Sequence, residues 1–338
     1  MAFDPNAAAL PDSGIFGLPH SPDEAKVVLI PVPFEATTSY GGGTAEGPAA
    51  ILEASKQVDL FDLDTGRPYE GGIAMLEIPA QVRAWNDEAK QLAAPIIAEA
   101  GATKGDPRLA AVDALCEKMN AWVYETTKHW LAKGKLFGLV GGDHSTPFGC
   151  IRAHAEKYPG LGVLHLDAHA DLRDAYEGFT WSHASIMFNV LQRIPQVGKL
   201  VQVGIRDFGE AELDVVRDSG GRVHTFFDAR LQRARLDGMP WREAVDSIVA
   251  ELPQHVYLSW DIDGLDPTLC PHTGTPVPGG LSFGQAVGLL EGLQRAGKTI
   301  VGFDLNEVAP GPDDEWDANV GARLLYKQIG WALLTQQP

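Results

Sequence analysis

Short apolar runs alternate with longer amphipathic stretches along the whole chain. Seven of these runs are rich in β-branched residues and predict strands, at 26–33, 136–140, 162–166, 200–205, 222–227, 255–262 and 299–305. Their hydrophobicity is continuous rather than alternating, which is typical of strands that are buried on both faces of a parallel sheet.

Between these runs, apolar residues recur at helical spacing. This periodicity predicts helices at about 46–57, 108–133, 147–157, 183–193, 209–219, 240–251, 282–296 and 317–335. The succession of strands and helices indicates an α/β protein whose parallel sheet carries helices on both faces. The segment 66–107 lacks a clear pattern, and we expect an irregular excursion or an oligomer contact there. No repeat or linker interrupts the chain, so residues 1–338 are predicted to form a single domain.

Clusters of aspartate and histidine directly follow several predicted strands, the place where parallel α/β sheets bind ligands. The candidates are His144 in "GGDHS", Asp167, His169 and Asp171 in "DAHAD", Asp261 and Asp263 in "DIDGLDP", and Glu307 in "DLNEVAP". A single aspartate at such a place is usually a helix cap or a turn former. Several carboxylates that converge on one point repel each other, however, and a divalent cation removes that conflict.

The number and type of these side chains indicate more than one metal ion. Two imidazoles and four carboxylates exceed what one structural zinc ion takes in a tetrahedral site. They suit two ions, about 3.5–4 Å apart, that share bridging carboxylates. The mixture of imidazole and carboxylate favours Mn²⁺ or Ni²⁺.

The composition narrows the choice of partners. The 338 residues are 45% hydrophobic, enough for a large core, and carry a formal net charge of -18. Such a charge disfavours nucleic acids and anionic membranes, and it mildly favours a cationic substrate. The three cysteines lie far apart, which argues against a disulfide framework and fits a reducing cytoplasm. We expect neither a signal peptide nor a membrane span.

Three motifs, "GGDHS" (141–145), "DAHAD" (167–171) and "SWDIDGLDP" (259–267), resemble in sequence and order those of the ureohydrolase family, which includes arginase and agmatinase. The resemblance covers nearly the whole chain. It implies a three-layer α/β/α fold with a central parallel sheet of about eight strands. It also implies a hydrolase that releases urea from a guanidino compound, and a homo-oligomer, either a trimer or a hexamer.

The resemblance further implies a role for each site residue. One metal would be held by His144, Asp167, Asp171 and Asp261, and the other by His169, Asp167, Asp261 and Asp263. A metal-bound hydroxide, oriented by Asp171, would attack the guanidinium carbon. Glu307 would grip the guanidinium nitrogens. His183 would carry a proton to the leaving amine, since a histidine titrates near neutrality.

The loop that follows "DAHAD" departs from arginase. Arginases carry an Asn- and Ser-rich loop that binds the α-carboxylate of the substrate, whereas this chain has "LRDAYEGFTWS". Gly209 stands where arginases place the aspartate that binds the α-amino group. The aromatic residues Tyr176, Trp181 and Trp316 suit a compact or alkylated guanidine. We therefore expect agmatinase or guanidinase activity, with these three residues and Arg173 at the substrate.

Other functions stay open from the sequence. Arginase activity is one. Formimidoylglutamase activity is another, because Arg173 could bind a carboxylate, although it could equally pair with Asp174 or Glu177 in its own loop. A non-catalytic subunit of a hetero-oligomer is a third alternative, which the complete ligand set disfavours because such a subunit would have been free to lose ligands. A deacetylase-type enzyme is a fourth, which the ligand set disfavours because such an enzyme would use one zinc ion. His165 is expected to be an ordinary core histidine, and the glycine-rich segment 39–51 lacks the ending of a phosphate loop.

Overall fold

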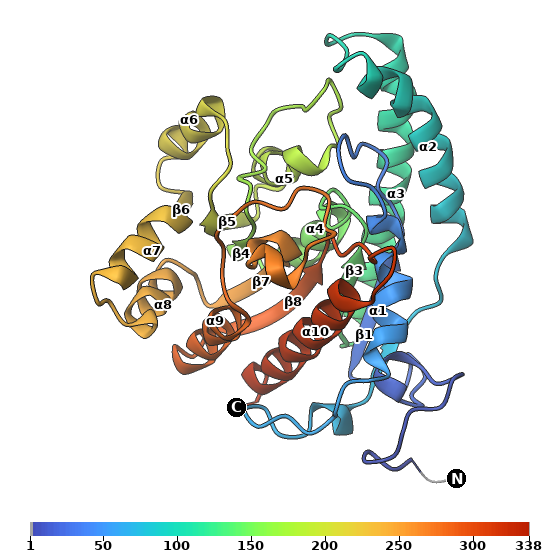
Figure 1. Cartoon of the computed structure of the whole chain (residues 1–338), viewed down its shortest axis with the longest axis vertical. Coiled ribbons are helices and arrows are strands. Elements are labelled where there is room, and N and C mark those ends of the chain that lie inside the picture. The colour runs from blue at the N-terminus through green and yellow to red at the C-terminus, as the bar shows by residue number, and fades with distance from the viewer. Residues whose placement is uncertain (1–2, 338) are drawn as a thin grey trace.

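The computed structural model describes residues 3–337 and contains one eight-stranded sheet in which all neighbouring strands are parallel. In chain order the strands are β1 (Val27–Val32), β2 (Ile73–Met75), β3 (Leu136–Gly141), β4 (Leu161–Leu166), β5 (Val197–Ile205), β6 (Val223–Phe227), β7 (His255–Trp260) and β8 (Thr299–Leu305). In space they follow the order β2-β1-β3-β8-β7-β4-β5-β6 (Figure 1). Every residue of β1 and β4 is buried, which explains their continuous hydrophobicity.

Helices cover both faces of the sheet and give the fold its three layers (Figure 1). On one face the core includes side chains of α1 (Gly47–Ser55), α7 (Asp228–Leu236), α8 (Trp241–Ala250), α9 (Phe283–Arg295) and α10 (Trp316–Thr335). On the other it includes side chains of α2 (Ala80–Ala98), α3 (Pro107–Ala132), α4 (Phe148–Lys157), α5 (Ile186–Arg193) and α6 (Glu210–Asp218). The predicted α/β/α fold is thereby confirmed.

Two helices and one strand differ from the sequence prediction. The expectation that 66–107 is irregular is wrong, because this segment contains helix α2 and strand β2. The buried positions of α2 are mostly small or polar and give only a weak hydrophobic signal: Val82, Asn86, Ala89, Ala93 and Ile96. Strand β2 is an edge strand of three residues, too short to form a pattern. Helix α7 was not predicted either, since only Asp228 and Leu231 are buried in it.

The strand order places β3, β8, β7 and β4 next to one another at the centre of the sheet. Because all strands are parallel, their carboxyl ends lie at the same edge. These four strands are the ones that lead into the four polar motifs. The topology therefore gathers motifs that lie far apart in the sequence. In the part of the chain described, no helix has the length and apolar character needed to cross a membrane.

Candidate active site

The carboxyl ends of the four central strands bring the predicted metal ligands into one cluster. His144 follows β3, the segment 167–171 follows β4, Asp261 and Asp263 follow β7, and Glu307 follows β8. All of them are buried except the histidine of the β4 segment, whose side chain is 26% exposed. The predicted set thus lies together at the centre of that edge of the sheet.

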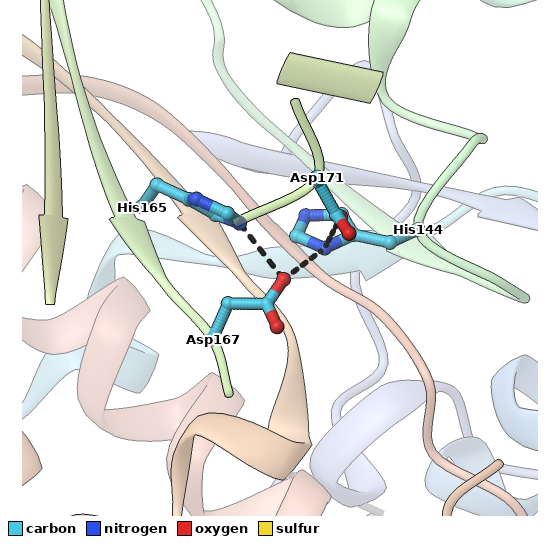
Figure 2. A group of neighbouring side chains, drawn as sticks. All are labelled: His144, His165, Asp167 and Asp171. Atoms are coloured by element: carbon cyan, nitrogen blue, oxygen red, sulfur yellow. Dashed lines mark hydrogen bonds and ion pairs between the residues drawn. The ribbon is translucent and has the colours of Figure 1, made fainter. Parts of the chain in front are cut away.

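Asp167 contacts His144 in the first ligand group (Figure 2). Its Oδ2 is 3.1 Å from Nδ1 of His144. The same nitrogen lies 3.5 Å from Oδ2 of Asp171 and 3.5 Å from Oδ2 of Asp261. One imidazole nitrogen therefore faces three carboxylates that come from the ends of two strands.

A second group lies around the other oxygen of Asp167. Nδ1 of His169 is 3.4 Å from Oδ1 of Asp167 and 3.1 Å from Oδ2 of Asp263. The backbone N–H of Asp263 donates to Oδ1 of Asp261 at 2.8 Å, which joins the two groups. Their composition resembles the two ligand sets that the sequence implied, and the assignment of individual ligands stays a prediction.

The electrostatics of the cluster fit a cation. Burial, followed by the charge of Asp167, raises the pKa of Asp171 well above its usual range. Burial and the charges of Asp263 and Asp167 do the same for the pKa of Asp261. Burial and the charge of Asp261 likewise raise the pKa of Glu307. Dications between these oxygens would relieve the repulsion, so the donor set suits metal ions.

Two of the site residues have a left-handed backbone. The φ angle is 54° at Asp171 and 62° at Glu307. The carbonyl of Asp171 accepts hydrogen bonds from the backbone N–H groups of Met187 and Phe188, both at 3.1 Å. The carboxylate of Glu307 accepts one from the N–H of His144 at 2.9 Å. Contacts with other segments therefore hold both residues in a conformation that L-amino acids disfavour.

A row of polar side chains crosses the sheet just below the cluster. Strand register and hydrogen bonds place its members side by side on β6, β5, β4, β7 and β8: Thr225, Gln202, His165, Ser259 and Asp304. The Thr225 hydroxyl donates to Oε1 of Gln202 at 2.9 Å, and Nε2 of Gln202 lies 3.0 Å from Nδ1 of His165. At the other end, the Ser259 hydroxyl donates to Oδ1 of Asp304 at 3.1 Å.

Two members of this row touch predicted metal ligands. Nε2 of His165 lies 2.8 Å from Oδ2 of Asp167, and Oγ of Ser259 lies 2.9 Å from Nε2 of His144. His165 is fully buried, as expected, but it is not an ordinary core histidine because its ring binds a site carboxylate. The sequence signal that could have revealed both residues is a single polar side chain inside an apolar strand.

Residues 25–330 match the model of the Arginase family. The chain belongs to this family. It is 37% identical over 320 residues to an N(1)-aminopropylagmatine ureohydrolase of Thermus thermophilus, covering 94% of each chain. It is 30% identical over 315 residues to agmatinase of Pyrococcus horikoshii, covering 91% of this chain and 92% of that one.

The solved structures support the same arginase-family fold. Proclavaminate amidino hydrolase from Streptomyces clavuligerus superposes with a TM-score of 0.74 at 24% identity, covering 98% of this chain and 100% of that one. The family match and the two relatives described above make the chain an agmatinase-like member of the arginase family. It is a hydrolase of the ureohydrolase class.

A cavity of about 200 Å³ opens onto the cluster of this arginase-family protein. His169, Asp171 and His183 line it together with side chains of other loops, among them Tyr40, Arg173, Tyr176, Asp207, Phe208 and Glu212. The lining residues that come from segments outside the motifs were not predicted from the sequence. Their position depends on how the loops pack, and no local pattern reports it.

His183 begins a short 3-10 helix, His183–Ser185, at the wall of the cavity. Its ring centroid is 6.0 Å from that of Tyr176 in a T-shaped arrangement. Burial, followed by the positive charge of His169, lowers the pKa of His183 to about 4. The imidazole is therefore neutral near pH 7, but this pKa departs from the titration near neutrality on which the predicted role as a proton shuttle is based.

The predicted substrate residues separate into two sets. Arg173 and Tyr176 line the cavity. Trp181 instead packs against Phe148, with ring centroids 4.8 Å apart, and Nε1 of Trp316 donates to the carbonyl of Thr268 at 2.9 Å. Neither tryptophan is among the residues that line the cavity, and neither is Glu307, the predicted partner of the guanidinium group. The structure thus brings only part of the predicted substrate set together.

Proposed function

We propose that this chain is a dinuclear-metal hydrolase that cleaves a C–N bond of a guanidino compound and releases urea with an amine or ammonia. The observation that supports this most strongly is the pair of ligand groups around Asp167, which adjoin the cavity. His144, Asp167, Asp171 and Asp261 would hold one Mn²⁺ or Ni²⁺ ion, and His169, Asp167, Asp261 and Asp263 the other.

The chain's own groups would then carry out three tasks. Bound metal ions supply an activated water molecule for the reaction. Asp171, which belongs to the cluster and lines the cavity, orients the attacking water. Glu307 pairs with the nitrogens of the guanidinium group and fixes its plane. His183 accepts a proton in its neutral form and passes it to the leaving amine.

The charges along the cavity favour a substrate whose far end is cationic or small. Arg173 is paired with Glu212 through Nε and lies over the ring of Tyr176, so a substrate carboxylate would have to compete with Glu212 for it. Asp207 lines the cavity, is exposed, and forms no ion pair within residues 3–337. Phe208 adds aromatic surface that suits an alkyl chain. We therefore propose agmatine, guanidine or a small substituted guanidine as substrate, in preference to arginine.

The named relatives support a substrate with a cationic tail, and the three widely spaced cysteines support a protein of the reducing cytoplasm. Two relatives are named for agmatine or an aminopropyl derivative of it, both of which carry a cationic tail. We propose that residues 1–338 form one ureohydrolase domain that works in the cytoplasm. We also propose a homo-oligomer, a trimer or a hexamer, with a hetero-oligomer as the alternative.

A substrate panel tests the proposal. The protein, loaded with Mn²⁺ or Ni²⁺, is given agmatine, aminopropylagmatine, guanidine, methylguanidine, arginine, guanidinobutyrate and formimidoylglutamate, and urea or formamide is measured. We expect urea from the first four compounds in preference to the next two, and Asp171→Asn should abolish it. If a protein that holds two metal ions per chain releases no urea from any of them, the proposed function is wrong.

A further inference from the structure

The side-chain amide of Gln202 has only one orientation that satisfies its neighbours. Its nitrogen lies 2.7 Å from the carbonyl oxygen of Ala170, which can only accept a hydrogen bond. Its oxygen accepts from the hydroxyl of Thr225 at 2.9 Å. Rotating the amide by half a turn would place two oxygens against each other at Ala170. The amide nitrogen therefore also faces Nδ1 of His165, at 3.0 Å.

This orientation determines which nitrogen of His165 carries the proton. Because an N–H group of Gln202 faces Nδ1, that nitrogen must be the acceptor. The proton of the neutral ring then resides on Nε2, which lies 2.8 Å from Oδ2 of Asp167 and donates to it (Figure 2). The hydrogen bonds thus run in one direction, from Gln202 through His165 to Asp167.

Asp167 is one of the two carboxylates assigned to both ligand sets, and it contacts a histidine of each. Its Oδ1 accepts from the backbone N–H of His169 at 2.6 Å, and its Oδ2 accepts from His165. A donor on each oxygen holds the plane of the carboxylate, so that the remaining lone pairs point toward His144 and His169. Gln202 also holds the carbonyl of Ala170, which lies between two ligand residues of the same segment.

We propose that His165 and Gln202 are positioning residues that orient the Asp167 carboxylate for two metal ions. The inference rests on the proposed dinuclear function. It assigns His165 to the support of a ligand rather than to the ligand set, although its ring lies close enough to the cluster to be considered a ligand. Loss of such a supporting hydrogen bond typically costs about 10–100-fold in metal affinity or activity.

The test compares two replacements of His165 that differ in one donor. In His165→Gln the amide nitrogen can reach the place of Nε2 and donate to Asp167, whereas His165→Phe preserves the shape of the ring without a donor. Gln202→Leu leaves the His165 tautomer unspecified, and His154→Phe replaces another fully buried histidine that touches none of the ligands. Mn²⁺ dissociation constants are measured by competition with a chelator, alongside kcat and the melting temperature of each metal-free protein.

We expect His165→Phe to weaken Mn²⁺ binding about 10–100-fold, Gln202→Leu to weaken it less, and His165→Gln to retain most of it. The control should bind as the wild type does. A purely structural role predicts the reverse order, because phenylalanine is easier to bury than glutamine. The inference is wrong if the phenylalanine and glutamine variants bind Mn²⁺ equally well. If neither His165 variant folds, the inference is wrong when Gln202→Leu binds Mn²⁺ as tightly as the wild type does. Wild-type protein that binds no metal would instead overturn the proposed function.

Discussion

Arg173 and Glu212 form an ion pair at the wall of the cavity, with 3.5 Å between Nε of the arginine and Oε2 of the glutamate. Glu212 is buried and also accepts hydrogen bonds from the backbone N–H groups of Leu172 and Gly209, at 3.0 and 2.7 Å. The glutamate thus comes from the α6 region and not from the arginine's own loop. Its negative charge offsets the positive charge of Arg173, the residue that the sequence suggested as a binding site for a substrate carboxylate.

This pairing leaves Asp207 as the charged group available to a substrate tail. We expect Asp207→Asn to lower kcat/KM for agmatine about threefold, the effect of a partly exposed ion pair worth ~0.7 kcal/mol. The same variant should act on methylguanidine as the wild type does, because that substrate has no cationic tail. Asp174→Asn removes an equal charge from an exposed residue outside the cavity lining and serves as the control. Equal losses for both substrates would contradict this assignment.

The sequence predicted that these aspartate and histidine side chains meet at one edge of the sheet, because each of them directly follows a predictable buried strand; their role as metal ligands stays a prediction. Parallel strands deliver such residues to one edge whatever their distance along the chain. The supporting row was not predicted, since its members contact one another across neighbouring strands and the sequence does not show which strands pair. Neither was the partner of Arg173. The choice between Asp174, Glu177 and Glu212 depends on where loops pack, and local sequence does not encode that.

The assignment of His183 can be tested by separating catalysis from metal binding. His183→Ala should lower kcat by about 10²–10⁴, the usual contribution of a general acid–base group, while both metal ions remain bound. Metal content is measured by elemental analysis after gel filtration. His183→Gln, which keeps a polar side chain but cannot transfer a proton, should be equally slow. If either variant loses its metal, the residue is a structural support of the cluster instead.

Metal should stabilise the folded protein as well as activate it. At free Mn²⁺ about a hundred times its dissociation constant, we expect the free energy of unfolding to rise by about 2.7 kcal/mol per site, measured by urea denaturation with and without chelator. His144→Ala and Asp261→Asn should abolish turnover and remove this gain. Asp314 belongs to a separate group with His272 and Asp317. The control variant Asp314→Asn should therefore change neither the turnover nor the stabilisation by Mn²⁺. A full metal effect in His144→Ala would refute the ligand assignment.

His154 provides a pH dependence that is independent of the metal site. It is fully buried, its Nδ1 donates to the carbonyl of Cys150 at 2.8 Å, and burial lowers its pKa from 6.5 to about 4. Between these values the unfolded chain binds more protons, so stability is complete above pH 6.5 and falls as the pH drops toward 4. The loss should approach about 3 kcal/mol.

The variant His154→Asn isolates this effect, since its amide can still donate to Cys150. The difference in unfolding free energy between wild type and variant, measured on metal-free protein in urea, should shrink as the pH is lowered from 7 to 4. His129→Asn changes an exposed histidine and should run parallel to the wild type. A constant offset for His154→Asn over this range would show that its protonation is not linked to folding.

The left-handed backbone at Asp171 and Glu307 sets a limit on how this protein can be improved. Each conformation costs a non-glycine residue about 1–3 kcal/mol, and glycine at either place would release that strain. The same exchange would remove a carboxylate on which the proposed chemistry depends. Selection for heat resistance alone would therefore favour glycine at these two positions and would reduce activity. Selection for activity would retain the aspartate and the glutamate, although the local backbone disfavours them.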